Sequence, residues 1–389
     1  MKIAMLGAKA VPAIGGIAHY VEELGARLAD RGHEVTVYCR PHFLQDGSGP
    51  YRGMRRVVTR GLRGKHLDAA THSFTAALHA LKEDFDILHI HGSAPGSLAP
   101  LLRRKRQARV VVTVHGLDWQ GGKWGRWASR TMYLAARVGA RSADGLTAVS
   151  EVVRDQYQQL VGVTPVFIPT GVHLAEPVAA QELTTLGVEA GRYIFCAARL
   201  VKEKGVHYLV EAFADLDTDL KLVIAGDCPY EDSYVQRLRA QASDRIIFAG
   251  YVTGRLLAEL YSNAYVYVQP SEMEGLPIAV LEAMSYGRYV LASDIPANRE
   301  ALGPCGGTFK SRDVNALRTE LAALLRQPEI IQAEFDRVRA YIRAERNWDL
   351  TADRFETLYQ TLATGDQVAT SRRSTAGGGK SDDTRNHNG

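Results

Sequence analysis

The stretch AYVYVQPSEMEGLPIAVLEAMSYG, residues 264–287, contains a strand, a loop and a helix in the order that decides the fold. Its first half is rich in aromatic and β-branched side chains, which favours a buried strand. Pro277 suits the first turn of a helix, and Gly287 suits its end. The helix predicted between them is largely apolar. The carboxylate of Glu282 inside it therefore indicates a partner that needs a negative charge.

The same alternation of strand and helix runs along most of the chain. Helix-length segments such as 16–31 and 67–82 separate several of the short strand-like runs. These runs are KIAMLGA (2–8), HEVTVYCR (33–40), DILHIHG (86–92), RVVVTVHG (109–116) and GLTAVS (145–150), then RYIFCAARL (192–200), LKLVIAGD (220–227), RIIFAGYV (245–252), AYVYVQPS (264–271) and RYVLASD (288–294). The alternation predicts an α/β fold with parallel, doubly wound, Rossmann-like sheets. Two such series predict two domains facing a central cleft, with ligands beyond the carboxyl ends of the strands.

The length of the chain also indicates two domains. At 389 residues it exceeds the ~250–300 residues at which a single hydrophobic core stops growing. Residues 1–168 are predicted as the first domain and residues 169–347 as the second. Residues 348–362 are predicted as a final helix that packs back on the first domain. Residues 363–389 have almost no apolar content and are predicted to be a disordered tail.

The composition excludes several classes of protein. The chain begins with a strand-like pattern and contains no apolar run near 18 residues, so neither a signal peptide nor a membrane-spanning helix is predicted. Its cysteines are far apart and form no CxxC pair, which indicates reduced thiols in a cytoplasmic protein. They are Cys39, Cys196, Cys228 and Cys305.

Positive charge is concentrated in two stretches without acids. These are Arg52, Arg55, Arg56, Arg60, Arg63 and Lys65, and then Arg103, Arg104, Lys105, Arg106 and Arg109. They form either two solvated faces or a basic surface for peripheral contact with an anionic membrane, where each cation is worth about 1 kcal/mol. No known nucleic-acid reader motif accompanies the charge, so nucleic acid is not an expected partner.

Three groups of residues near predicted strand ends have chemistry that suits an anionic ligand. Gly15 and Gly16 open a helix whose N–H groups and positive dipole end favour an anion, although a Gly-Gly pair also suits a tight turn. Arg199 and Lys204 supply a guanidinium fork and a point charge suited to a diphosphate, unless they are solvated surface cations. The third group is Glu274 with Glu282, which are either a pair of glycosidase carboxylates or hydroxyl acceptors along one extended ligand.

Taken together, these groups resemble glycosyltransferase family 4, the retaining nucleotide-sugar transferases of GT-B fold. The resemblance rests on Gly15-Gly16, Arg199-x4-Lys204, and Glu274-x7-Glu282 within EGLPIAVLEAMS, and it extends from residue 1 to about residue 362. It implies a nucleotide-diphosphate sugar as donor and a carbohydrate or lipid-linked acceptor, in surface glycan or glycoconjugate synthesis.

The resemblance also implies a role for each residue. Arg199 and Lys204 would bind the donor diphosphate and stabilise the departing nucleotide. Glu282 would accept hydrogen bonds from the ribose hydroxyls. Glu274, with the backbone of Gly275 and Leu276, would hold the transferred sugar.

On the opposite side of the cleft, Gly15 and Gly16 would approach the donor phosphate. A single histidine at the end of a strand, such as His115, is usually a structural residue. The resemblance implies instead that His115 would contact the hydroxyls of the donor sugar.

The segment HGLDWQGGKWGRW, residues 115–127, resembles the rhamnosyltransferase-like subgroup that acts in polysaccharide synthesis. Asp118, Trp119 and Trp124 in this segment are candidate acceptor-binding residues. The tryptophans would supply a platform for a sugar or lipid, or alternatively a cluster that anchors a helix.

No metal or other cofactor is predicted. The DxD-like pair Asp217 and Asp219 falls between a helix and a strand, where a surface turn is expected. Two other functions remain open: an epimerase or hydrolase acting on sugar nucleotides with the same fold, and a non-catalytic nucleotide-sugar-binding protein. The sequence does not reveal the nucleotide base, the sugar, the acceptor or the oligomeric state.

Overall fold

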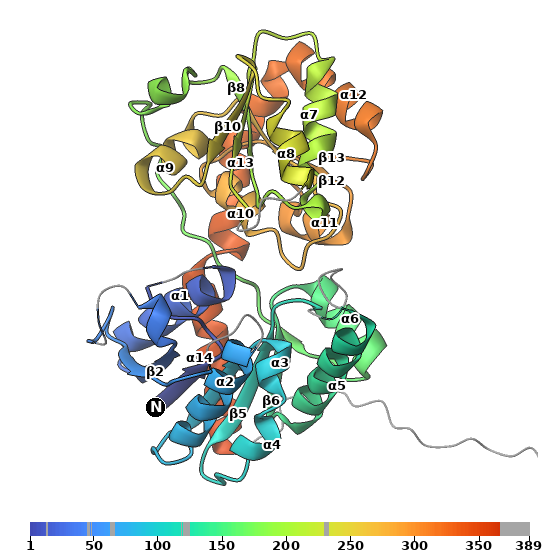
Figure 1. Cartoon of the computed structure of the whole chain (residues 1–389). Coiled ribbons are helices and arrows are strands. Elements are labelled where there is room, and N and C mark those ends of the chain that lie inside the picture. Colours follow the sequence, from blue (N-terminus) through green and yellow to red (C-terminus); the bar gives the residue numbers. More distant parts are fainter. Residues whose placement is uncertain are drawn as a thin grey trace, which may run out of the picture.

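A computed structural model describes residues 1–12, 15–44, 47, 49–62, 67–117, 119, 125–228 and 233–365. Two α/β units lie one above the other in Figure 1, joined at two places in the chain. Each has one parallel sheet with helices on both faces. The predicted architecture of two facing Rossmann-like domains is confirmed.

The N-terminal domain contains a seven-stranded parallel sheet of order β3-β2-β1-β4-β5-β6-β7. Its strands are β1 (Lys2–Leu6), β2 (Glu34–Cys39), β3 (Arg55–Val58), β4 (Ile87–His91), β5 (Arg109–Val114), β6 (Gly145–Ala148) and β7 (Val166–Phe167). Its helices are α1 (Gly16–Asp30), the 3-10 turn η1 (Pro41–Phe43), α2 (Leu67–Ala80), α3 (Ser93–Gly96), α4 (Ala99–Leu102), α5 (Arg126–Ser142) and α6 (Glu151–Val161). Apolar residues of β1, α1 and the last helix form one core layer, and apolar residues of α2, α5 and α6 form the layer on the other face.

The C-terminal domain contains a six-stranded parallel sheet of order β10-β9-β8-β11-β12-β13. Its strands are β8 (Tyr193–Ala197), β9 (Lys221–Ala225), β10 (Ile246–Gly250), β11 (Val266–Gln269), β12 (Val290–Ser293) and β13 (Gly307–Phe309). Its helices are η2 (Leu183–Leu186), η3 (Lys202–Lys204), α7 (Val206–Ala214), α8 (Ser233–Arg239), α9 (Gly254–Ser262), α10 (Ile278–Ser285), α11 (Pro296–Leu302), α12 (Val314–Arg326) and α13 (Pro328–Glu345). Pro277 lies at the N-cap of α10, one residue before the position predicted for it.

The two crossings between the domains lie side by side. The backbone N–H of Val172 donates to the carbonyl of Arg346 at 2.7 Å, beside a short parallel bridge to Asn347. A Cβ at Gly171 would clash with the backbone of Trp348, so only glycine allows this close approach. The final helix α14 (Trp348–Thr364) then packs back on the N-terminal domain against α1.

The first basic stretch is not the free cationic face that one of our two interpretations required. Arg52 pairs with Glu23 at 2.6 Å and Arg55 pairs with Glu83 at 2.9 Å. Arg56 is buried and donates to the carbonyls of Gly49 and Val11. These arginines tie the edge strand β3 to its surroundings. Arg63 and Lys65 lie outside the described residues.

The second stretch is partly paired in the same way. Arg103 lies 3.1 Å from Asp144, and Lys105 lies 3.4 Å from Asp84 and also donates to the carbonyl of Glu83. All four cysteines are free thiols. Within the described residues, none of the helices combines the length and the apolar character needed to cross a membrane.

Candidate functional site

Two adjoining pockets lie between the domains, beyond the carboxyl ends of both sheets. The first has a volume of about 510 Å³ and is lined by Gly15, Gly16, Ile17, His19, Tyr20, His115, Val149, Thr170, Leu276, Ile278, Glu282 and Trp348. The second has a volume of about 600 Å³ and is lined by Lys9, Gly15, Ala197, Ala198, Arg199, Ala225, Gly226, Asp227, Cys228, Tyr251, Val252, Leu257, Tyr261, Ala279 and Glu282. Gly15 and Glu282 line both, so the two pockets form one cleft.

The N-terminus of α1 faces both pockets. Gly15 is its N-cap and has φ 99°, a conformation that a residue with a Cβ rarely adopts. An added Cβ at Gly15 or Gly16 would meet no atom within 4 Å, so it is the backbone conformation at Gly15, and not crowding, that calls for glycine. The first-turn N–H groups and the positive end of the helix dipole are available to an anion here.

Lys204 and Glu274 form an ion pair at the mouth of the C-terminal domain. The Nζ of Lys204 lies 2.6 Å from both carboxylate oxygens of Glu274. The side chains are 17% and 6% exposed. The same carboxylate accepts hydrogen bonds from Gln269 at 2.9 Å and from Ser271 at 2.7 Å. Glu274 is therefore held in one orientation by residues at the end of β11.

Arg199 lies two residues beyond the end of β8 and lines the second pocket. It is exposed and forms no ion pair with any described residue. Its guanidinium is thus available to a ligand, whereas the ammonium group of Lys204 is already neutralised by Glu274. Tyr251 lines the same pocket and is 80% exposed, so an aromatic face is also open to a ligand there.

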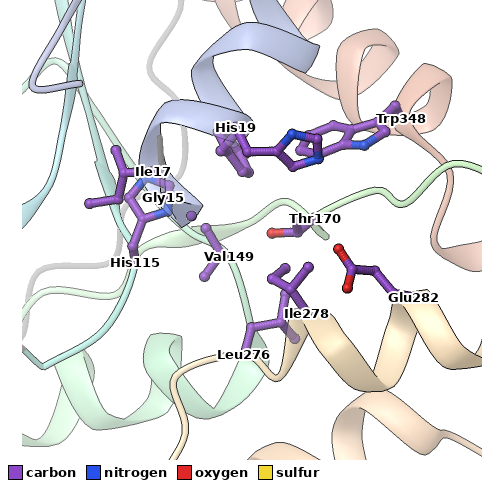
Figure 2. A pocket seen from close by; sticks show the side chains of 12 residues that line it. Gly15, Ile17, His19, His115, Val149, Thr170, Leu276, Ile278, Glu282 and Trp348 are labelled. Atoms are coloured by element: carbon purple, nitrogen blue, oxygen red, sulfur yellow. The ribbon is translucent and has the colours of Figure 1, made fainter. Parts of the chain in front are cut away.

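Glu282 lies between the two pockets on α10. Figure 2 shows its carboxylate pointing from the helix into the first pocket, toward Thr170. Burial raises the pKa of Glu282, and a 2.9 Å hydrogen bond donated by Tyr261 partly opposes that rise. A second hydrogen-bond donor from a ligand would stabilise the carboxylate further.

His115 follows β5 and forms one wall of the first pocket. Burial lowers the pKa of His115 to about 4, so its imidazole is neutral at pH 7. Its Nε2 lies 3.3 Å from Nδ1 of His91, and its ring packs edge-on against Tyr20. A Cβ on Gly275 would lie 2.7 Å from the carbonyl oxygen of His115. The loop that carries Glu274 can approach His115 because glycine stands at this position.

Two interdomain contacts were not predicted from the sequence. The hydroxyl of Ser150 donates to the carbonyl of Gly275 at 3.0 Å. The carboxylate of Glu300 on α11 accepts from the backbone N–H groups of Glu151 and Val152, at 2.8 and 2.9 Å, and so caps α6 across the cleft. A serine before a helical run was a readable N-cap signal, but its partners in the other domain could not be found from spacing.

Several predicted roles change when the geometry is known. Trp119 is 9% exposed and packs edge-on against Tyr133 and Tyr157, so it anchors the core and does not provide an acceptor platform. Asp118 and Trp124 lie outside the described residues. Glu272, in the same loop as Glu274, accepts a hydrogen bond from the Tyr208 hydroxyl at 2.8 Å and pairs with Arg312 at 2.8 Å.

Leu276 lines the first pocket and packs against the cores of both domains. In Figure 2, Leu276 and Ile278 approach from the side of α10, and His19 and Trp348 lie on the opposite side with α1. Asp217 and Asp219 are exposed in the loop between α7 and β9, at the sheet edge away from the cleft. No group of three or more His, Cys, Asp or Glu that could hold a metal ion occurs within the described residues.

Both halves of the chain match glycosyltransferase families. Residues 14–176 match the model described as Glycosyltransferase Family 4, and residues 186–345 match the model described as Glycosyl transferases group 1. These two matches meet near the linker between the domains and together span most of the chain. They contain all the lining residues of both pockets except Lys9 and Trp348.

Curated relatives and solved structures agree with these matches. The chain is 25% identical to N-acetyl-alpha-D-glucosaminyl L-malate synthase of Bacillus anthracis, over 93% of this chain and 98% of that protein. It is 27% identical to phosphatidyl-myo-inositol mannosyltransferase of Mycolicibacterium smegmatis, over 93% and 94% respectively. Anabaena HepE, solved in complex with UDP and glucose, matches with a TM-score of 0.76 at 18% identity, over 92% of this chain and all of that one. The likeness to solved structures confirms the GT-B fold.

Proposed function

Because the chain belongs to the glycosyltransferases of the GT-B type, we propose that it transfers a hexose-type sugar, with retention of configuration, from a nucleotide-diphosphate donor. The acceptor is a carbohydrate or a lipid-linked molecule, and the product enters surface glycan or glycoconjugate synthesis. The observation that carries this proposal is the cleft that Gly15, Arg199 and Glu282 line from both domains. The ion pair of Lys204 with Glu274 lies on the loops that follow β8 and β11, at the same end of the C-terminal sheet.

In our proposal the donor lies along the second pocket with its base at one end and its diphosphate at the other. Tyr251 would stack on the base, and Glu282 would accept hydrogen bonds from the ribose. The diphosphate would then lie between Arg199 and the N-terminus of α1 at Gly15. This order assigns Tyr251, Glu282, Arg199 and the α1 N-terminus to successive parts of a nucleoside diphosphate. HepE, whose structure contains UDP and glucose, has the same fold and supports a donor of this class.

Lys204 would change partners when the donor binds. Without a ligand it pairs with Glu274, whose carboxylate is also held by Gln269 and Ser271. A diphosphate beside Lys204 would compete for its charge and leave Glu274 free to accept hydrogen bonds from the sugar. The two residues would then act on opposite sides of the bond that breaks.

In the transfer step, the bond between the anomeric carbon and the phosphate oxygen breaks, and the acceptor hydroxyl oxygen bonds to that carbon from the same face. The departing phosphate takes the hydroxyl proton. Arg199 and Lys204 stabilise the charge that develops on the leaving diphosphate. We propose that these cations make the reaction independent of a metal. Neutral His115, at the wall of the first pocket, would contact the sugar hydroxyls.

The acceptor would enter the first pocket. Its lining is mainly apolar, and it includes two buried donors that have no hydrogen-bond partner among the described residues, the Tyr20 hydroxyl and the Trp348 Nε1–H. Such unpaired donors cost stability unless a ligand satisfies them. The relatives are named for phosphatidyl-myo-inositol and for malate, so their names support the class of reaction and leave the acceptor open.

We also propose that the enzyme belongs to the rhamnosyltransferase-like subgroup and acts in the cytoplasm. The segment behind the subgroup assignment, residues 115–127, lies partly outside the described residues. The subgroup assignment is tested by identifying the sugar that the enzyme transfers.

The test is nucleotide release from UDP-, GDP-, dTDP- and ADP-sugars, with and without EDTA. The proposal requires turnover with at least one donor, unaffected by EDTA and greatly reduced in Arg199→Ala. Normal turnover in Arg199→Ala would contradict the assigned role. Tight nucleotide binding without turnover, in the presence of a broad set of acceptors, would favour a non-catalytic binding protein.

A further inference from the structure

Exposed large apolar side chains are concentrated on one face of the N-terminal domain. Within the described residues, Trp127, Leu134 and Val138 of α5 are 82%, 50% and 44% exposed. Phe74 and Leu78 of α2 are 48% and 40% exposed. Both helices cover the sheet face that carries the second core layer, and Figure 1 shows them on the outside of the domain. Single exposed apolar residues are ordinary, but five on two helices of one face form a candidate interaction surface.

The spacing places the apolar residues of α5 on a single stripe. Trp127, Leu134 and Val138 are separated by seven and four residues, which brings them to the same side of a helix. Ala136 and Ala140 point the other way into the core, and Gly139 packs against the backbone of Gly96 on α3. The exposed stripe is therefore the side of α5 that no described element covers.

The same helix is strongly cationic. Its 17 residues include four arginines and no acid. Arg126, Arg130 and Arg141 are exposed and form no ion pair with a residue that the structure describes, and the guanidinium of Arg137 lies 5.8 Å from the ring centre of Tyr133. Arg130 and Arg141 lie beside the apolar stripe. By contrast, four cations of the basic stretches first considered for membrane contact are paired with acids of the same domain, namely Arg52, Arg55, Arg103 and Lys105.

An apolar stripe flanked by arginines matches the surface of an anionic bilayer. The stripe can enter the boundary between headgroups and acyl chains while the guanidinium groups contact lipid phosphates. A second copy of α5 would bring arginines together, which opposes self-association. A nucleic acid would match the charge but would leave the tryptophan, leucine and valine side chains without apolar contacts.

We propose that α5 is an interfacial helix that binds this protein to anionic lipid bilayers. Trp127, Leu134 and Val138 enter the headgroup region, and the four arginines of the helix hold it there by charge. Phe74 and Leu78 of α2 extend the apolar contact on the same face. The N-terminal end of α5 follows the loop after β5, so Trp127 anchors the domain at the cleft edge of its sheet. This inference does not depend on which donor or acceptor the enzyme uses.

The test is cosedimentation of the full chain with vesicles of phosphatidylcholine alone or mixed with phosphatidylglycerol. The proposal predicts at least tenfold tighter binding to the anionic vesicles, and weaker binding at high salt. Arg130→Glu/Arg141→Glu and Trp127→Ser/Leu134→Ser should each weaken binding at least tenfold. The matched control is Arg237→Glu/Arg326→Glu, the same charge change on exposed helix residues of the C-terminal domain, which should bind as the unmodified chain does.

A spectroscopic measurement separates insertion from general charge attraction. Tryptophan emission should shift to shorter wavelength when anionic vesicles are added, and Trp127→Phe should lose that shift while it still binds. Equal binding to both vesicle types, or unchanged binding by the α5 variants, would overturn the proposal. A dimer that the α5 variants dissociate, in a protein that does not bind vesicles, would overturn it too and assign the stripe to a second copy of the chain.

Discussion

Replacing Lys204 by methionine should lower the free energy of unfolding far more than the loss of an exposed ion pair does. Methionine keeps most of the length of the side chain and removes its charge. Glu274 would then be a buried carboxylate, 6% exposed, that keeps only the hydrogen bonds from Gln269 and Ser271. Breaking a buried pair on one side costs about 3–5 kcal/mol, because the remaining charge has no partner.

The expected cost is smaller than that range because two donors remain and the cleft is open to water on one side. We expect Lys204→Met to lower the free energy of unfolding by ~2–3 kcal/mol at pH 7. Adding Glu274→Gln should restore most of this loss, since no buried charge then remains. The assay is urea unfolding followed by circular dichroism, with the two single variants and the double variant compared in one thermodynamic cycle.

Arg192→Met is the matched control. Arg192 and Asp219 lie 3.8 Å apart with side chains 54% and 95% exposed, so their pair should contribute less than about 1 kcal/mol. A loss in Lys204→Met no greater than that of the control would refute the burial argument. So would strictly additive effects of Lys204→Met and Glu274→Gln, because additivity means that the two side chains do not interact in the ligand-free protein.

Three further predictions follow from other parts of the site. Tyr20→Phe removes a buried hydroxyl without a partner among the described residues, so the free energy of unfolding should stay equal or rise by up to about 1 kcal/mol. Transfer to the acceptor should fall. A lower free energy of unfolding would show that the hydroxyl has a hydrogen-bond partner. Burial lowers the pKa of His89 to about 3 and that of His115 to about 4, so the unfolded chain takes up protons below pH ~6.5 that the folded chain does not. Stability measured by urea unfolding should therefore fall between pH 7 and 5.5, and less steeply in His115→Gln; a flat profile would contradict this. Glu300→Ala removes both interdomain caps of α6, so small-angle scattering should show a more open molecule, whereas Glu300→Gln, which keeps an acceptor, should open less.

The sequence predicted the central strands of both sheets because they are continuous apolar runs with glycine or polar ends. It missed β3, β7 and β13, which lie at sheet edges and are short or charged. Strand β3 begins with Arg55 and Arg56, whose charges suggested a surface stretch. Pairing of Arg55 with Glu83 and hydrogen bonds from Arg56 to the carbonyls of Gly49 and Val11 allow these arginines to stand in a strand. Glu83 and Val11 are 28 and 45 positions away in the sequence.

The candidate site also contains contacts between residues that the sequence could not predict. The residue types at Arg199 and Glu282 predicted ligand contacts, and both side chains line the cleft. The pairing of Lys204 with Glu274 could not be predicted, because the two residues are 70 positions apart and both were assigned to the ligand. For Trp119, the sequence left open an acceptor platform or a cluster that anchors a helix, and the rings of Tyr133 and Tyr157 packed against it favour the second.

The cleft contains residues that hold the two domains together as well as residues proposed to bind the ligand. Gly275 allows the Glu274 loop to reach the carbonyl of His115, Ser150 then bonds to the Gly275 carbonyl, and Glu300 caps α6 beside it. Gly275 acts here through its lack of a side chain, and Ser150 and Glu300 act through hydrogen bonds across the cleft. Together they hold the N-terminal wall close to the loop that carries Glu274. A larger side chain at Gly275 would separate His115 from Glu274 without changing either of them. Gly275→Ala should therefore reduce transfer even though nucleotide binding in the second pocket is retained.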